Sequence, residues 1–360
     1  MPRLKFLIIA SILFYPGILM AQAPVVDYSR ADSLGRNIKY ENDINLLTKK
    51  LTAPFHDPFL KARAIFIWIT SNIEYDYKFF NKYEYKGREP KGFQCEGDSI
   101  GCDIKRQVWE NQYVLRVLDK RKGVCQGYSM LFEKMCKIAG LECWTVPGYA
   151  RTDEDEVGTP GELDHAWNVI LLNGVYYPLD ATWAAGSCSK DEDGKLDDFT
   201  PNFNDYYWLT PPEKFARNHF PEDTKWVLVH NFTIEKFSAN PYYSPAYIDN
   251  TDLVTPATGI INAKRGDTIR FKLKHKERIY DLQINTNLFT NPEIYSVTRV
   301  KKKFQVEVDT LALKAQQYFN FKYDDGLYEF AYIVKDSSLD YIDIIFDKKK
   351  VMRFKVKMQR

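Results

Sequence analysis

The dipeptide Asn173-Gly174 constrains this chain of 360 residues more than any other short segment. It separates two runs that alternate in the manner of strands, residues 165–172 and residues 175–180. Asn-Gly suits a two-residue hairpin turn, because both central residues of that turn need a positive φ. Such a turn also fixes the register, so that Leu172 pairs with Val175. The segment therefore predicts an antiparallel hairpin with a defined pairing.

The predicted register brings two ionisable side chains together. Counting outward from the turn sets Trp167 opposite Asp180, and His165 opposite Thr182. His165 and Asp180 then lie diagonally on one face, about 7–8 Å apart at the backbone, which is within reach of an imidazole–carboxylate hydrogen bond. A histidine in a strand is more often an ordinary, partly buried polar residue. An acid placed beside it by register favours a functional pair instead.

A cysteine lies at the start of a predicted helix upstream of this hairpin. From Cys125 to Ala139 the apolar residues recur at helical spacing, and Gly140 follows where a helix C-cap is expected. A helix N-terminus and a neighbouring imidazolium both lower the pKa of a thiol. A lone cysteine at such a place is usually structural, but the hairpin supplies a base and an acid. We therefore predict Cys125 as nucleophile, His165 as base and Asp180 as the acid that orients the base.

Three short motifs resemble the core of the transglutaminase-like superfamily, which is related to papain-like cysteine enzymes. They are GVCQGY at residues 123–128, HAWN at residues 165–168 and LDATW at residues 179–183. Segments between about Ile44 and Val229 are more narrowly similar to the kyphoscoliosis-peptidase-type branch, among them WI at 68–69, NIEYD at 72–76, PEKF at 212–215 and HFP at 219–221. In that branch the residues at positions 125, 165 and 180 form the triad.

The resemblance implies an α+β fold, in which the nucleophile helix packs on an antiparallel sheet. It also implies acyl transfer from an amide through a thioester, with water or an amine as the second substrate. A peptidase or amidase that acts on protein or peptide substrates is the leading prediction. A cross-linking transglutaminase is the alternative within enzymes, and a scaffold that only binds a surface partner is the alternative outside them.

Further residues are candidates for binding substrate near the triad. The N–H of Cys125 is a natural oxyanion donor, because it is unsatisfied at a helix N-terminus. Gln126 is a candidate for the second donor, although lining the pocket is the other role open to it. Trp167 and Trp183 are expected to flank the triad, either as substrate platforms or as core residues of strands. His219 is expected to make a structural hydrogen bond rather than to act as a second base.

The six cysteines bear on disulfides and metals. Cys95 and Cys102 bracket a glycine-containing loop and are the predicted disulfide, with two free thiols as the alternative. Cys136 follows the apolar stripe of its helix and is predicted to be a buried structural thiol. No cysteine or histidine pair has the spacing of a zinc site, and the acidic turn at 191–194 lacks the closing glutamate of a calcium loop. We therefore predict no metal and no cofactor.

The N-terminus has the layout of a secretory signal peptide. Two basic residues precede an apolar run that ends near Ala21, after which cleavage is expected. An uncleaved anchor is the alternative, but the run is short for a bilayer and Pro16-Gly17 interrupts it. We therefore predict an exported protein, periplasmic or secreted, with no membrane span after cleavage of residues 1–21.

The rest of the chain is predicted to form two domains. Residues 22–235 are the catalytic domain, 236–258 a polar, proline-containing linker, and 259–360 a small antiparallel β-sandwich of the immunoglobulin-like kind. The acidic loop at 152–164 is expected to be solvated. A net charge of +2 favours neither nucleic acid nor an anionic membrane as a partner. A cell-wall or surface partner of the C-terminal domain is left open.

Overall fold

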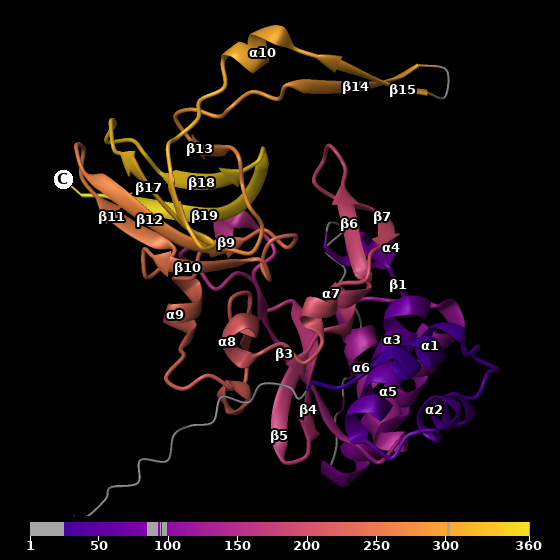
Figure 1. Cartoon of the computed structure of the whole chain (residues 1–360). Helices are drawn as coiled ribbons and strands as arrows, with labels where there is room; N and C mark the ends of the chain where they lie inside the picture. Colours follow the sequence, from indigo (N-terminus) through magenta and orange to yellow (C-terminus); the bar gives the residue numbers. More distant parts are fainter. Residues whose placement is uncertain (1–24, 85–92, 94, 96–98, 301–302, 360) are drawn as a thin grey trace, which may run out of the picture.

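The computed structural model describes residues 25–359 except 85–92, 94, 96–98 and 301–302 (Figure 1). The predicted signal peptide, residues 1–21, lies outside the described residues. Two hydrophobic cores divide the chain, one with buried members from Ala31 to Phe215 and one with buried members from Tyr243 to Val356. None of the described helices is long and apolar enough to cross a membrane.

Helices dominate the first half of the N-terminal domain. They are α1 (Ser29–Asn37), α2 (Ile44–Thr52), α3 (Pro58–Asn72), α4 (Tyr77–Glu84), α5 (Ser99–Lys120) and α6 (Cys125–Ile138). The carboxylate of Asp57 accepts a hydrogen bond from the Phe59 N–H at 2.9 Å, and Pro58 fills the first turn, so α3 begins where the sequence predicts. Most of α3 is buried, which makes it the central helix of this core.

Helix α6 packs on a four-stranded antiparallel sheet. Its strands, in spatial order, are β5 (Val175–Leu179), β4 (His165–Leu172), β3 (Glu142–Ala150) and β8 (His219–Pro221). Asn173 and Gly174 have φ of 51° and 82°, and β4 and β5 pair from Leu172 with Val175 outward, as predicted. Helix α6 contacts β3 and β4, and the buried Asn168 amide donates to the Ser129 carbonyl of α6 at 3.0 Å. The predicted α+β arrangement of helix on sheet is confirmed.

The chain departs from the predicted strand at Asp180. Strand β5 ends at Leu179, and Asp180 becomes the N-cap of a short helix, α7 (Ala181–Ala185). Trp183 therefore lies on a helix and not on a strand. Helix α5 begins at Ser99, so Cys102 lies on a helix and not at the end of the predicted glycine-containing loop.

Short elements complete this domain. They are β1 (Glu74–Tyr75), which pairs in parallel with β2 (Lys122–Gly123), the hairpin of β6 (Gly186–Lys190) and β7 (Leu196–Pro201), α8 (Pro212–Phe215), α9 (Ile234–Ser238), and the 3₁₀ turns η1 (Glu154–Glu156), η2 (Asp205–Tyr207) and η3 (Thr224–Trp226).

The second core lies between two sheets. One has the order β10 (Thr251–Thr255), β12 (Thr268–His275), β17 (Leu327–Ile333), β16 (Lys322–Asp324). The other has the order β11 (Ile260–Ala263), β19 (Lys349–Met358), β18 (Tyr341–Phe346), β13 (Leu282–Thr286), with β9 (Tyr242–Tyr243) also paired to β19. Apart from β9 and β11, the strands of the two sheets can be lettered A to G in chain order. The first sheet then has the order ABED and the second contains C, F and G, as in an immunoglobulin-like sandwich, with β11 added beside strand G.

An arm interrupts the sandwich between β13 and β16. It consists of β14 (Tyr295–Val300), β15 (Lys303–Val308) and α10 (Thr310–Lys314), and it projects away from the two sheets (Figure 1).

The predicted linker at 236–258 is wrong for most of its length. Strands β9 and β10 fall inside it and pair with β19 and β12. Its proline and polar residues suggested an open segment, yet Ile248 is only 1% exposed and belongs to the sandwich core. The sandwich therefore begins well before Gly259.

The acidic loop at 152–164 is not simply solvated, contrary to the prediction. Arg353 of β19 donates to Glu154 Oε1 at 2.8 Å and to Asp155 Oδ1 at 2.7 Å. Lys350 of the same strand pairs with Glu154 as well. Acidic residues of the N-terminal domain thus pair with basic residues of the sandwich that lie almost 200 positions later in the chain.

Replacing Arg353 by glutamine should lower the free energy of unfolding by about 2 kcal/mol, because the buried Asp343 carboxylate loses its 2.6 Å and 2.9 Å hydrogen bonds to Arg353 and keeps only Lys350, at 3.0 Å. Urea denaturation followed by tryptophan fluorescence measures the change. Lys272→Gln, which breaks an exposed pair with Glu329 in the same domain, is the matched control and should cost about 0–1 kcal/mol. Equal midpoints for the two variants would show that the Arg353 cluster contributes nothing.

Candidate active site

Cys125 is the first residue of helix α6 and is half-buried. Its sulfur lies 3.6 Å from the carbonyl oxygen of Asp164, the residue that immediately precedes strand β4. Gly127 allows α5 to approach this first turn closely, since a Cβ there would come within 2.9 Å of Val117 Cγ2. The predicted nucleophile is therefore held between the start of a core helix and the start of a core strand.

His165 and Asp180 form the contact that the hairpin predicted. His165 Nε2 lies 2.7 Å from Asp180 Oδ2, and the two residues are 9% and 0% exposed. Because Nε2 faces the carboxylate, Nδ1 is the ring nitrogen left for the thiol of Cys125. Burial lowers the pKa of His165, but the Asp180 charge and hydrogen bonds to Asp180 and Cys125 outweigh it and raise that pKa to about 10. The ring is thus an imidazolium over the neutral range.

The N-cap position orients the Asp180 carboxylate. Oδ1 accepts hydrogen bonds from the N–H groups of Thr182 at 2.8 Å and Trp183 at 3.1 Å, which leaves Oδ2 turned toward His165. Burial by itself raises the pKa of Asp180, but His165 and the hydrogen bonds to it hold that pKa well below its usual range. An ionised carboxylate is therefore kept in a site without solvent.

His219 also belongs to this site, although the sequence did not predict it there. The expected structural hydrogen bond exists, but its acceptor is the same Asp180 Oδ2, at 3.2 Å from His219 Nε2. Burial lowers the pKa of His219 to about 4. The only sequence signal was the HFP motif at 219–221, since the acid that His219 contacts lies 39 positions away.

The two predicted tryptophans both approach His165. Ring centroids lie 6.1 Å away for Trp167 and 5.1 Å away for Trp183. Trp167 is 3% exposed, which matches the core role, whereas Trp183 is half-buried and faces the site from α7. Position 148 has no room for a side chain, because a Cβ on Gly148 would lie 2.3 Å from the Trp167 ring.

Two N–H groups are available to a substrate oxygen at the start of α6. Within the described chain, the N–H groups of Cys125 and Gln126 have no hydrogen-bond acceptor. Gln126 itself is exposed. Tyr113 of α5 also reaches this turn, 3.7 Å from the position of a Cβ on Gly127, and burial together with Cys125 raises its pKa to about 12.

A small apolar cavity of about 30 Å³ adjoins the site on the far side of His219. Its lining includes Trp167, Phe215 and Trp226.

The donor atoms of His165, Asp180 and His219 lie within 4.8 Å of one another, a spacing that could hold a metal ion. The hydrogen bonds to Asp180 already engage these atoms, so we describe the group as a hydrogen-bonded network.

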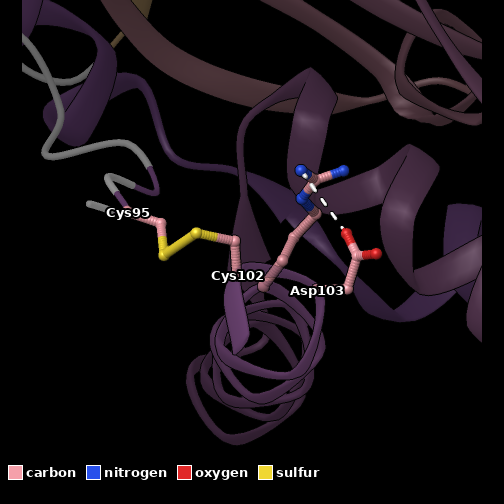
Figure 2. Close-up of a disulfide and its surroundings, with 4 residues drawn as sticks. Cys95, Cys102 and Asp103 are labelled. Carbon is pink, nitrogen blue, oxygen red and sulfur yellow. Dashed lines mark ion pairs between the residues drawn. A yellow bond between two sulfur atoms is a disulfide. The ribbon is translucent and has the colours of Figure 1, made fainter. Parts of the chain in front are cut away.

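The predicted disulfide is present. Cys95 and Cys102 are bonded, with their Cα atoms 5.6 Å apart, and Figure 2 shows the bridge beside Asp103 at the start of α5. Cys136 is buried as predicted, and so is Cys143.

The part of the chain that contains Cys125, His165 and Asp180 is similar to a known protein family and to several known proteins. Residues 93–181 match the model of the transglutaminase-like superfamily, a range that contains Cys125, His165 and Asp180. The kyphoscoliosis peptidases of Mus musculus and Homo sapiens are each 29% identical over 243 residues, which cover 66% of this chain and 32% of theirs. Hillarin of Drosophila melanogaster is 25% identical over 229 residues, covering 60% of this chain and 25% of hillarin.

The chain thus spans about a third of the length of the kyphoscoliosis peptidases that it matches. Among solved structures, that of a TGase covers 51% of this chain and 37% of its own, at 15% identity and a TM-score of 0.27.

Cys125 should react with iodoacetamide at mildly acidic pH, because His165 is positively charged there and supports the thiolate. His165→Ala should slow the labelling at least tenfold, and Asp180→Asn should slow it less. Cys188 is the internal control, since burial and Asp198 raise its pKa to about 11. Mass spectrometry reads each site, and equal labelling of Cys125 and Cys188 at low pH would refute the triad.

The two histidines should give the stability of the fold opposite pH dependences. The pKa of His165 is raised from 6.5 to about 10, so its stabilisation is complete below pH 6.5 and is lost as the pH rises toward 10. The pKa of His219 is lowered to about 4, so its stabilisation is complete above pH 6.5 and is lost as the pH falls toward 4.

Each titration should change the unfolding free energy by about 1.4 kcal/mol per pH unit. His165→Ala should remove the alkaline slope, and His219→Gln should reduce the acidic slope, to which His275 also contributes because burial lowers its pKa. Urea denaturation across the pH range measures both slopes. An alkaline slope that persists in His165→Ala would contradict the assignment.

Proposed function

We propose that this chain, whose residues 93–181 form a transglutaminase-like domain, is an exported acyl-transfer enzyme that hydrolyses protein or peptide amides. The observation that carries the proposal is the triad itself: a half-buried thiol at a helix N-terminus, an imidazolium beside it, and a buried carboxylate 2.7 Å from the far ring nitrogen. This is the geometry of an activated nucleophile with its base and orienting acid.

In the proposed reaction the thiolate of Cys125 attacks the amide carbonyl carbon. The carbonyl oxygen becomes negatively charged and is stabilised by the N–H groups at the start of α6. His165 gives its Nδ1 proton to the amide nitrogen, the C–N bond breaks, and the amine leaves. The products of this half-reaction are a free amine and a thioester on Cys125.

Water completes the cycle in the hydrolytic reading. His165, now neutral, takes a proton from water as the oxygen attacks the thioester carbon, and the thiolate leaves as the carboxylic acid is released. A primary amine in place of water would give a new amide, which is the cross-linking alternative. Asp180 stays ionised throughout and holds the ring so that Nδ1 faces the thiol.

The export part of the proposal rests on two supports. The N-terminal segment has the pattern of a signal peptide, and the Cys95–Cys102 disulfide suits an oxidising compartment. Both support a periplasmic or secreted location.

Binding of a cell-wall or surface partner through the C-terminal domain is the second candidate function. The arm favours it, because Tyr295 and Val308 pair across the ribbon and are 52% exposed each, with Val306 further along the same face at 59%. Replacing Tyr295 and Val308 by serine should weaken sedimentation of the full chain with a cell-wall fraction and leave peptide hydrolysis unchanged. Unchanged sedimentation would remove the support that the arm gives.

Hydrolysis and cross-linking separate in one assay. The protein is incubated with an unfolded glutamine-containing protein and a fluorescent primary amine, and the products are read by mass spectrometry and gel fluorescence. We expect new peptide fragments or conversion of amides to carboxylic acids, without incorporation of the amine. Cys125→Ala should abolish product formation, by about 10³-fold or more, while a control at the other half-buried free cysteine, Cys188→Ala, should retain it. Amine incorporation without hydrolysis would overturn the peptidase proposal in favour of cross-linking.

A further inference from the structure

The Asp180 carboxylate accepts hydrogen bonds from two imidazoles. Oδ1 is occupied by the N–H groups of Thr182 and Trp183, and Oδ2 lies between His165 Nε2 at 2.7 Å and His219 Nε2 at 3.2 Å. Asp180 is 0% exposed and His219 is 2% exposed, so water does not replace either contact. A buried carboxylate needs such donors, because each missing one leaves part of its charge unsolvated.

The protonation of His219 follows from its neighbours. A neutral imidazole carries one N–H, and the Asp180 carboxylate can only accept, so the proton belongs on Nε2. Nδ1 must then accept a hydrogen bond, yet the atom placed 2.8 Å from it is the Asn218 amide oxygen, which can only accept. A half-turn of that amide points its nitrogen at Nδ1 and its oxygen at the Tyr207 hydroxyl, which lies 3.4 Å from the amide. The result is a chain of donors that runs from Tyr207 to Asp180.

Packing fixes the ring in this orientation. Phe215 stacks on the His219 ring with centroids 4.0 Å apart, and the rings of Trp183 and Trp167 lie at 4.6 Å and 5.0 Å. The ionisable groups that face His219 are Asp180, His165 and, through Asn218, Tyr207. Tyr128 and Tyr207 are the further ionisable groups near Asp180.

We propose that His219 is a positioning residue of the active site: as a neutral donor to Asp180 Oδ2, it keeps the carboxylate ionised and aimed at His165. The inference rests on the proposed function. Because two N–H groups converge on one oxygen, the carboxylate cannot rotate when His165 gives up its proton during amide cleavage. His219 is therefore neither a second base nor a simple packing residue.

Two variants separate donation from packing. His219→Phe keeps an aromatic ring for Phe215 but has no N–H, and His219→Gln loses the ring but can place an amide N–H near the position of Nε2. We expect kcat for amide hydrolysis to fall about 10- to 100-fold in His219→Phe with KM changed less than threefold. His219→Gln should retain most of the activity. A packing role predicts the reverse order of the two variants.

The pH dependence of Cys125 alkylation gives a second readout that needs no substrate. Loss of the donor should loosen the hold of Asp180 on the His165 imidazolium, so the acidic edge of the labelling profile should move up in His219→Phe and stay in place in His219→Gln. Thermal melting of each variant is recorded beside it, so that an unfolded variant is recognised.

Asn218→Leu provides the test if His219→Phe does not fold. It keeps the His219 ring and its packing but removes the partner of Nδ1, and it should reduce kcat in the same direction by a smaller factor. A wild-type edge and kcat in a folded His219→Phe, or an unchanged kcat in Asn218→Leu, would overturn the inference. An unreactive Cys125 in the wild-type protein would instead refute the proposed function, so the two failures are distinguishable.

Discussion

The site depends on the burial of one charge. Asp180 has no access to water, and no Lys or Arg side chain of the described chain contacts it. Its charge is compensated by an imidazolium and by N–H groups, which come from β4, α7 and β8. A buried anion of this kind is tolerated only when its donors are complete. The end of β5, the start of α7 and the position of β8 are therefore constrained by the same carboxylate.

The sequence predicted the part of this site that local rules control. The turn at Asn173-Gly174 fixes the register of β4 and β5, and the apolar stripe fixes the face of α6, so Cys125, His165 and Asp180 followed from spacing. Even there the detail differed, because Asp180 reaches His165 as a helix N-cap and not as a strand residue. The N-cap was difficult to anticipate, since ATWAA is a five-residue helix with little periodicity to detect.

The features that the sequence did not predict depend on contacts between segments that lie far apart in the chain. His219 meets Asp180 across 39 positions, and Arg353 meets Asp155 across 198. Each residue taken alone has an ordinary explanation, a buried histidine or a solvated charge, and only the folded chain supplies its partner. The linker prediction was wrong for the same reason: proline and polar residues describe its composition, whereas the pairing of β9 with β19 depends on a strand 109 residues away (352 minus 243).

Residues 217 to 219 serve three parts of the molecule in succession. Arg217 donates to the carbonyls of Ile248 and Thr251 on the sandwich side, Asn218 lies in the donor chain from Tyr207, and His219 reaches the triad. Insertion of a single residue here would turn the following side chains to the opposite face of the strand and break the alignment of these three sets of contacts. The N-terminal domain and the sandwich are consequently not interchangeable modules: a chimera with a foreign sequence after Phe215 would lack β8 and the contact of His219 with Asp180.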